Sequence, residues 1–307
     1  MSGSSTQRGG ASRRKRGRAA RRSRLLQGEN EASDVGADAR TDAPPAGPED
    51  LREGQWPVST GEVALERDPY TPDTWTVLVN GVPSSSINLS DPLHLDFEYM
   101  RWMALILGNV FDAEARLRVL HLGGGAAAFP RYVNAAFPKS RQVVVEFDAR
   151  LNELVRGWFD LPRAPMLRLR SGDALDVVPT LTAASRDVVV RDVFVGDVTP
   201  SGFVDAGFVG EVARVLAPDG LYLLNVGDGP ELVNVRRELS TLKGTFGNII
   251  AVSDPAVFKG RRRGNIVMAA SNQGFGDAAR LVKGLLSDPL PAQVLAGNEL
   301  ESRFGAK

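Results

Sequence analysis

From residue 117 to residue 270 the chain alternates short apolar runs with amphipathic stretches, and this alternation limits the fold more than any other feature. The runs LRVLHL, RQVVVE and RDVVVR are rich in β-branched residues, whereas ARLNELVRGWF has its apolar residues at helical spacing. Near-continuous apolar strands that alternate with helices form a parallel sheet covered on both faces. The runs NIIAVSD and GNIVMAA end the pattern without a convincing helix between them. We therefore expect an α/β fold with a mostly parallel sheet and an antiparallel edge.

A second pattern precedes this domain. GEVALERD, TWTVLVNG and SSSINLS are short, β-rich and separated by turn residues, and Asn80-Gly81 is a strong hairpin signal. We expect a small antiparallel β module over residues 56–92, a Rossmann-like nucleoside-binding domain over 93–287 and a C-terminal tail over 288–307.

The first 55 residues differ in composition from the rest. Residues 1–24 contain nine Arg and Lys and no acid, and residues 25–55 contain eight acids. A stretch with so few large apolar residues cannot offset its ordering entropy, which predicts a disordered polyampholyte tail over residues 1–55. The run RRKRGRAARR is either an arm for nucleic-acid phosphates or a solvated segment. Nucleic-acid binding is expected only through this tail.

The composition excludes several kinds of site. The chain has no cysteine and two histidines, which excludes disulfides, a thiol nucleophile, cysteine zinc sites and a histidine-rich metal cage. No apolar stretch approaches the roughly 18 residues of a membrane span, and the start lacks the apolar core of a secretory signal. We expect a cytoplasmic protein that uses no metal and does not contact membranes.

A glycine-rich loop, HLGGGAAAF, follows the first apolar strand and opens a helix. Gly123, Gly124 and Gly125 would let the backbone approach a ligand, and a helix N-terminus favours polar or anionic groups. The spacing Gly123-x-Gly125-x-x-Ala128 fits dinucleotide binding, binding of S-adenosylmethionine-type nucleosides, or a tight strand–helix turn.

Acids follow the second and third strands. Glu146 ends the second strand, where a carboxylate can accept both hydroxyls of a ribose, whereas Asp148 fits the N-cap of the next helix. Asp173, in SGDA, is placed either to accept from an adenine amino group or to cap a short helix, and one side chain can do both.

The fourth strand ends at Asp192, and Asp197 follows in the loop VFVGDVTP. Two acids that face one pocket would suit a cationic substrate such as an amine or diamine. The alternative is a surface loop with solvated acids. His121 lies in an apolar strand and fits a hydrogen-bonded core residue, and His94 alone supports no catalytic role.

The motifs VLHLGGG, VVVEFD, SGDA, VVVRDVF and FVGEVARVLAPDGLYLLNV resemble, in order and spacing, the spermidine synthase (polyamine aminopropyltransferase) family. The resemblance is strongest to its divergent actinobacterial branch and covers roughly residues 60–285. It implies a methyltransferase-type Rossmann-like fold behind an N-terminal β region. It also implies transfer of an aminopropyl group, in polyamine biosynthesis, from decarboxylated S-adenosylmethionine to a diamine such as putrescine, without a metal. We expect a homodimer.

The resemblance also implies roles for single residues. The glycine loop, Gly123 to Gly125, would hold the adenosyl donor. Glu146 would bind its ribose and Asp173 its adenine. Asp192 would orient or deprotonate the attacking amine. Asp197 would bind the substrate, as the displaced second acid of the diamine site.

The chain departs from the family pattern mainly in the diamine half of the site. Ala126 stands where the family usually has an Asp that attracts the donor's amine, and a Gln often found before the domain is replaced near Ser84. The loss of the acid makes intact S-adenosylmethionine easier to accept, so a methyltransferase is an alternative. A non-catalytic nucleoside-binding protein is another. An NAD-dependent oxidoreductase fits Asp173 and the antiparallel edge less well.

Overall fold

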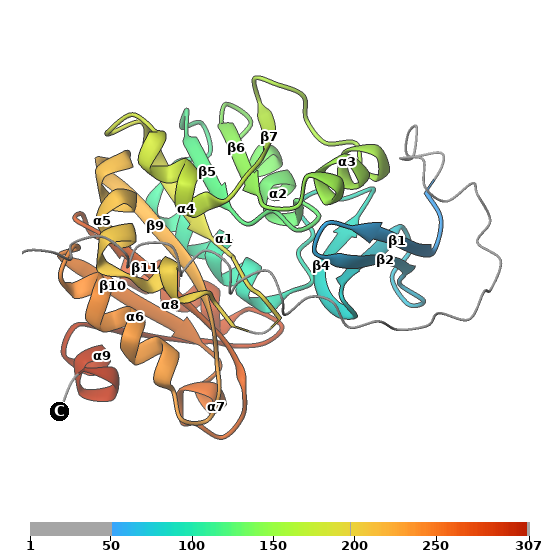
Figure 1. Cartoon of the computed structure of the whole chain (residues 1–307). Coiled ribbons are helices and arrows are strands. Elements are labelled where there is room, and N and C mark those ends of the chain that lie inside the picture. The colour runs from blue at the N-terminus through green and yellow to red at the C-terminus, as the bar shows by residue number, and fades with distance from the viewer. Residues whose placement is uncertain (1–50, 197, 306–307) are drawn as a thin grey trace, which may run out of the picture. The chain divides into compact units, whose positions relative to one another are not determined.

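The computed structural model describes residues 51–196 and 198–305. The predicted tail lies outside the described residues as far as residue 50, and so does Asp197. Within the described part, the strands form a four-stranded and an eight-stranded sheet (Figure 1). None of the helices in this part combines the length and the hydropathy that crossing a membrane requires.

The smaller sheet is an antiparallel meander in the order β1-β2-β3-β4. Its strands are β1 (Gly54–Val58), β2 (Gly61–Arg67), β3 (Thr74–Val79) and β4 (Val82–Asn88). Asn80 and Gly81 join β3 to β4 with φ angles of 51° and 76°, as the hairpin signal predicts. Its first strand begins at Gly54, two residues before the expected start of the module.

The larger sheet has the order β12-β10-β11-β9-β8-β5-β6-β7. Its strands are β5 (Arg118–Leu122), β6 (Arg141–Glu146), β7 (Leu167–Ser171), β8 (Arg186–Arg191), β9 (Leu216–Asp228), β10 (Asn248–Ser253), β11 (Gly264–Ser271) and β12 (Gln293–Ala296). The five neighbouring strands β7-β6-β5-β8-β9 pair in parallel. The strands β11, β10 and β12 then pair antiparallel and form the other edge. The predicted fold class is confirmed.

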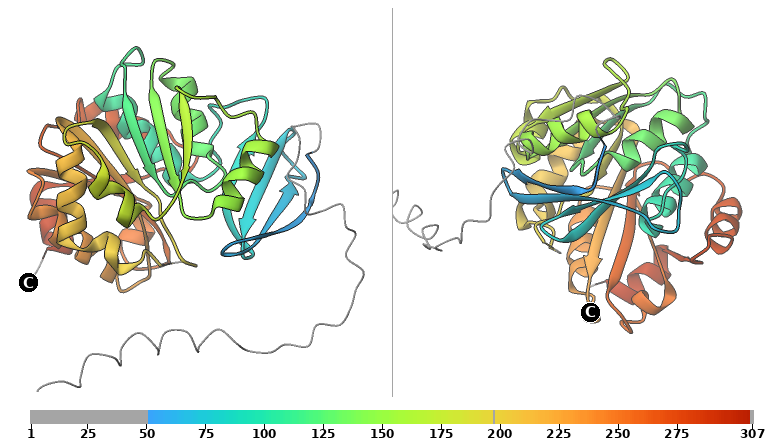
Figure 2. Two further views of the ribbon diagram at one scale, coloured as in Figure 1. Left: turned by 45° about the horizontal axis from the view of Figure 1, so that its top comes forward. Right: turned by 90° about the vertical axis from the view of Figure 1, so that its right-hand side faces the viewer.

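Helices cover both faces of this sheet (Figure 2), and a separate apolar core lies between the sheet and the helices on each face. One face carries α1 (Glu98–Val110), α2 (Ala128–Ala136), α3 (Ala149–Trp158) and α8 (Ala278–Leu286). The other carries α4 (Ala174–Val177), α5 (Ala206–Val215), α6 (Val233–Lys243), α7 (Pro255–Phe258) and α9 (Gly297–Phe304). Short 3₁₀ turns, η2 (Val178–Thr180) and η3 (Ser201–Val204), precede α5.

The C-terminal residues differ from the expected tail. The strand β12 pairs with β10, and Phe304 of α9 packs on Phe258 with ring centroids 5.7 Å apart. A strand of four residues and a helix of eight are too short to show a clear hydrophobic period. The sequence therefore misses both elements.

The order in which strands are added to the sheet reverses between β5 and β8. It continues from β5 to β6 and β7 on one side, then returns to add β8 and β9 on the other. Loops diverge at such a switch point, and the crevice outside the carboxyl ends of the strands is where open α/β sheets bind ligands. Gly123 lies there with φ of 84°, and a Cβ at this position would be 2.2 Å from the carbonyl oxygen of Asp192. Only a glycine lets the two loops approach this closely.

An aromatic contact joins the smaller sheet to α3. Trp56 of β1 is 4% exposed and meets Trp158 of α3 edge-on, with ring centroids 4.9 Å apart. Replacing Trp56 with Ala should lower the free energy of unfolding by about 3–5 kcal/mol, because it leaves a cavity between them. Urea unfolding measures this loss. Trp75→Ala, at a half-buried position of the same sheet, is the control and should cost less. Equal losses would contradict the packing role given to Trp56.

The switch point supplies a second prediction. Gly81 has a φ of 76° like Gly123, but a Cβ at Gly81 would meet nothing within 4 Å. Gly81→Ala should therefore lose only the left-handed backbone preference, about 1–2 kcal/mol. Gly123→Ala should lose more, since it also pushes the Asp192 carbonyl away. The comparison is by thermal and urea unfolding of both variants, and equal losses would count against the close approach.

Candidate functional site

The loops that follow β5, β6, β7 and β8 are joined in register by backbone hydrogen bonds. Three bonds of 2.9 Å connect them: Asp192 N–H to Leu122 O, Gly123 N–H to Val145 O, and Gly172 N–H to Glu146 O. Adjacent strands lie about 4.8 Å apart, so the β6 and β8 ends are about 10 Å from each other. The glycine loop, Glu146, Asp173 and Asp192 thus come together along one edge of the sheet.

Glu146 is held by the backbone of its own loop and of the glycine loop. Its Oε2 accepts from the Gly124 N–H at 2.9 Å, and its Oε1 accepts from the Asp148 N–H at 3.1 Å. A carboxylate has about four acceptor positions, so each oxygen retains one for a ligand. The half-buried side chain is therefore oriented before any ligand binds.

Asp148 is the N-cap of α3, as the sequence predicts. Its carboxylate accepts from the backbone N–H of Arg150 and Leu151, and from Thr60 through both N–H and hydroxyl, at 2.7–3.1 Å. Burial raises the pKa of Asp148, but the bonds from Leu151 and Thr60 outweigh it and hold the pKa below the usual 3.8. This residue connects the β module to the helix that follows Glu146.

Asp173 caps α4 by accepting from the Leu175 N–H at 2.8 Å through Oδ1. Its Oδ2 has no protein partner among the described residues, so the cap leaves one oxygen for a ligand. The two interpretations of this residue are compatible.

Asp192 lies on the α1 face of the sheet between two side chains that the sequence analysis did not identify. Tyr99 of α1 donates from its hydroxyl to Oδ2 at 2.8 Å, and Asn225 of β9 donates from Nδ2 to Oδ1 at 3.1 Å. Burial raises the pKa of Asp192, although the bonds from Asn225 and Tyr99 and the charge of Arg191 oppose it. Burial and the Asp192 charge hold the pKa of Tyr99 well above 10, so Tyr99 stays neutral and donates.

The β module contacts the glycine loop directly. Ser85 of β4 accepts from the Ala126 N–H at 3.0 Å, and a Cβ on Gly125 would be 2.8 Å from the same Ser85 oxygen. Ala126 is completely buried. The position where the resemblance implies an acid thus holds a methyl group with no exposure to solvent.

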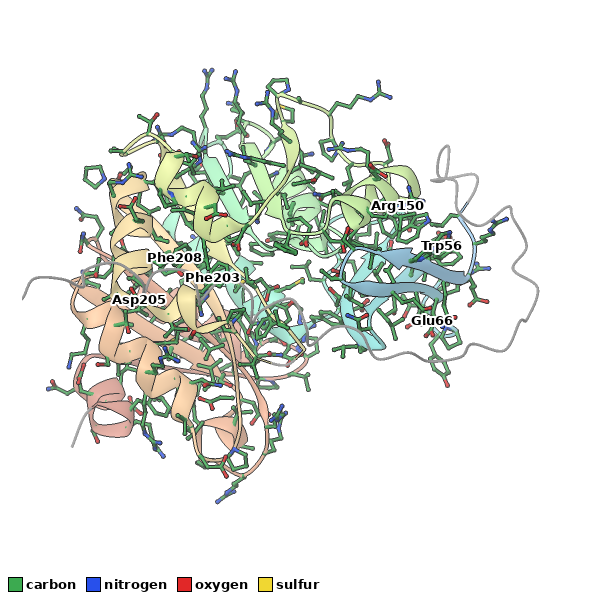
Figure 3. All side chains as sticks on the ribbon, viewed as in Figure 1. Trp56, Glu66, Arg150, Phe203, Asp205 and Phe208 are labelled. Atoms are coloured by element: carbon green, nitrogen blue, oxygen red, sulfur yellow. The ribbon has the colours of Figure 1, made fainter. Side chains whose placement is uncertain are left out.

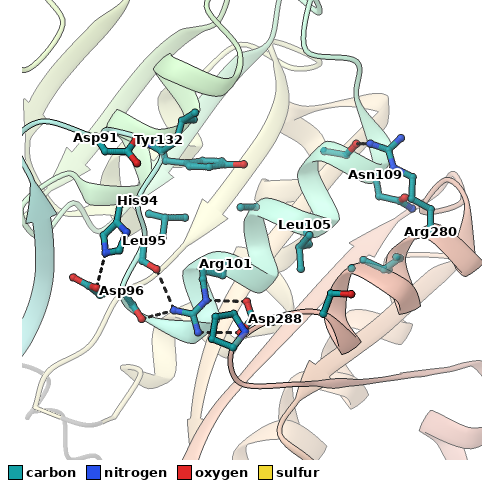
Figure 4. A pocket seen from close by; sticks show the side chains of 17 residues that line it. Asp91, His94, Leu95, Asp96, Arg101, Leu105, Asn109, Tyr132, Arg280 and Asp288 are labelled. Carbon is teal, nitrogen blue, oxygen red and sulfur yellow. Dashed lines mark hydrogen bonds and ion pairs between the residues drawn. The ribbon is translucent and has the colours of Figure 1, made fainter. Parts of the chain in front are cut away.

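A hollow of about 810 Å³ lies elsewhere, between α1, α8 and the segment before α1 (Figure 4). Among the residues that line it, Arg101 forms an ion pair with Asp288 at 2.8 Å, and His94 pairs with Asp96 at 2.7 Å. Neither the glycine loop nor Asp192 lines it. We therefore base the candidate site on the strand ends, where the oriented carboxylates gather.

The other predicted residues have different outcomes. His121 is buried, bonds to Gln142 at 2.8 Å and has its pKa lowered by burial to about 4, which makes it a neutral core residue. Asp197 lies outside the described residues, so its substrate role stays a prediction. Within the described ranges, no three His, Asp or Glu side chains gather as a metal site would require.

No protein-family model matches this chain, but it resembles several known proteins, among them the following three. The structure of a probable spermidine synthase from Corynebacterium glutamicum is 40% identical, with 84% of this chain and 95% of that chain covered and a TM-score of 0.79. The eEF1A lysine and N-terminal methyltransferase of Mus musculus is 31% identical over 133 residues, 40% of this chain. A polyamine aminopropyltransferase of Neisseria meningitidis is 24% identical over 163 residues, 52% of this chain and 61% of its own length.

These likenesses differ in extent. The match to the mouse methyltransferase spans 19% of that protein, about a fifth of its length. The match to the Corynebacterium protein, at 40% identity, extends over nearly the whole of that chain and over 84% of this one. The chain belongs to the spermidine synthase family.

Proposed function

We propose that the chain is an aminopropyltransferase, which moves an aminopropyl group from decarboxylated S-adenosylmethionine to a diamine such as putrescine. The observation that carries this proposal is the half-buried carboxylate of Asp192, oriented by Tyr99 and Asn225 beside the glycine loop. A negative group held there, next to a nucleoside-type loop, suits an amine nucleophile.

The strand ends offer a row of groups in the order that an adenosyl donor needs. Asp173 would accept from the adenine amino group through its Oδ2, and Glu146 would accept from the ribose hydroxyls. Gly123 to Gly125 would allow the sulfonium end to approach the backbone. Since Asp192 lies one strand beyond β5, the reactive carbon would face it.

The reaction would be an in-line displacement. The amine nitrogen forms a bond to the carbon next to the sulfonium, the carbon–sulfur bond breaks, and its electron pair neutralises sulfur as a thioether. The sulfonium is a good leaving group, so the enzyme's task is to supply an unprotonated amine. Amines titrate near 10, so a diamine is mostly protonated at pH 7. Asp192 would take the proton, and the burial that raises its pKa makes it a better base.

One observation favours a second candidate, a methyltransferase that uses intact S-adenosylmethionine. Ala126 carries no charge to repel the donor's carboxylate, and the chain also matches a methyltransferase at 31% identity. Calorimetric titration with decarboxylated and intact S-adenosylmethionine separates the two candidates. Preference for the intact donor, with methyl transfer, would replace the first proposal by the second.

The donor half of the proposal is tested at Glu146. Glu146→Ala should weaken binding of an adenosyl ligand by about 1–3 kcal/mol, because the ribose hydroxyls lose their acceptors. Isothermal titration with S-adenosylhomocysteine measures the change. Glu66→Ala, at the exposed position labelled on β2 in Figure 3, is the control and should bind like the wild type. Unchanged affinity in Glu146→Ala would remove this residue from the site.

The acceptor half is tested at Asp192. Asp192→Asn keeps the shape of the side chain but removes its charge and basicity, so transfer to putrescine should fall about a hundredfold or more. Donor affinity should change little, since Glu146 and Asp173 bind that half. Asp205→Asn, which alters the exposed cap of α5, is the matched control and should keep wild-type turnover.

Two results would contradict the acceptor half in different ways. Wild-type turnover in Asp192→Asn would reject only the role of this residue. A wild-type protein that binds the decarboxylated donor but transfers nothing to any diamine would reject the aminopropyltransferase itself.

A further inference from the structure

Arg191, the residue before Asp192, is a completely buried arginine at the end of an apolar strand. Its Nη2 lies 2.5 Å from Glu238 Oε1, and its Nη1 donates to Glu238 Oε2 at 3.2 Å and to the Phe203 carbonyl at 2.9 Å. The three residues before it, Val188 to Val190, are apolar and buried. Burying a charge pair costs more free energy than apolar packing at the same place, so packing alone does not account for it.

The arginine and the aspartate point to opposite faces of the sheet. Successive side chains on a strand alternate, and Asp192 faces Tyr99 of α1 whereas Arg191 faces Glu238 of α6. The ion pair therefore lies behind Asp192 and does not enter the candidate site. From there the charge of Arg191 lowers the pKa of Asp192.

Arg191 also links the end of β8 to Phe203, the two points between which the loop after Asp192 runs. Its own backbone ends β8, and its side chain holds the carbonyl of Phe203 in η3, labelled in Figure 3. The neighbouring Val204 carbonyl accepts from the Thr241 hydroxyl of α6 at 3.1 Å. The base of the segment is thus fixed to α6 at two points, and Glu238 and Thr241 are both on that helix.

We propose that Arg191 is a positioning residue for Asp192, and that its ion pair with Glu238 and its bond to the Phe203 carbonyl hold the strand end from which the Asp192 carboxylate projects. The inference rests on the proposed function of Asp192 as the group that handles the amine.

The electrostatics agree with this geometry. Burial raises the pKa of Asp192, and the nearby positive charge of Arg191 lowers it, as do the hydrogen bonds from Asn225 and Tyr99. Tyr99 faces Asp192 from α1 and stays neutral. Burial raises the pKa of Tyr222, which lies beside the guanidinium, to about 12, so Glu238 is the charged group opposite Arg191. Removing the arginine should therefore raise the pKa of Asp192.

The experiment uses the double variant Arg191→Met/Glu238→Leu. Apolar replacement of both members of a buried pair is tolerated, whereas Arg191→Met alone would leave a buried unpaired carboxylate. The matched control is Lys243→Met/Glu301→Leu, which removes a surface ion pair of 2.8 Å between Lys243 of α6 and Glu301 of α9. Cooperative urea unfolding checks that each variant folds.

Two readouts separate positioning from mere stability. Carbon-13 NMR follows the titration of the Asp192 carboxyl in ligand-free protein, and steady-state assays follow transfer to putrescine across pH. In the double variant the Asp192 pKa should rise, the acid limb of the kcat profile should move to higher pH, and kcat should fall about tenfold to a hundredfold. Donor affinity should stay the same, and the control should match the wild type in both readouts.

Arg191→Lys tests the fork geometry separately from the charge. Because it keeps a positive charge, Arg191→Lys should have an Asp192 pKa closer to the wild-type value than the double variant has. Its kcat should stay low, because an ammonium lacks the planar fork that reaches both Glu238 and Phe203. A folded double variant with wild-type Asp192 titration and wild-type kcat would overturn the proposal. If the wild type transfers no aminopropyl group, the proposed function fails, and the NMR titration still decides whether Arg191 acts on Asp192.

Discussion

The approach of Gly123 to the carbonyl of Asp192 is the contact on which the candidate site depends. Adjacent parallel strands bring their ends close, but a side chain at residue 123 would push the two loops apart. With a glycine there, the loop that suits a nucleoside and the acid that suits an amine become neighbours across one strand spacing. Both halves of the proposed site are then built mainly at one edge of the sheet.

Much of this arrangement could be predicted from the sequence because it follows from local periodicity. Apolar runs, glycines and strand-end acids occur in fixed order along the chain, and the topology of a parallel sheet places all such ends at one edge. The hairpin at Asn80-Gly81 and the cap at Asp148 could likewise be predicted, since each depends on one or two residues. What each strand-end acid binds is a separate matter and rests on the proposal.

Other parts could not be predicted because their signals are weak or nonlocal. Tyr99 lies on an amphipathic helix among apolar residues, and its sequence position does not indicate that Asp192, 93 residues later, accepts from it. Asn225 did leave a trace, as the polar residue in the apolar strand LYLLNV. Arg191 left a similar one in VVVRD. A polar or charged residue in an apolar strand indicates a buried partner, because burying such a group without one costs free energy.

The bond from the Ala126 N–H to Ser85 has a consequence for how the protein responds to ligands. It ties the glycine loop to β4, the edge strand of the smaller sheet. Ordering of the loop and ordering of β4 therefore stabilise each other. A ligand that binds only the ordered loop stabilises every structure that the ordered loop requires, and the stabilisation grows with the logarithm of the ligand concentration relative to its dissociation constant. A ligand bound at the glycine loop would therefore also stabilise β4 and, through it, the smaller sheet.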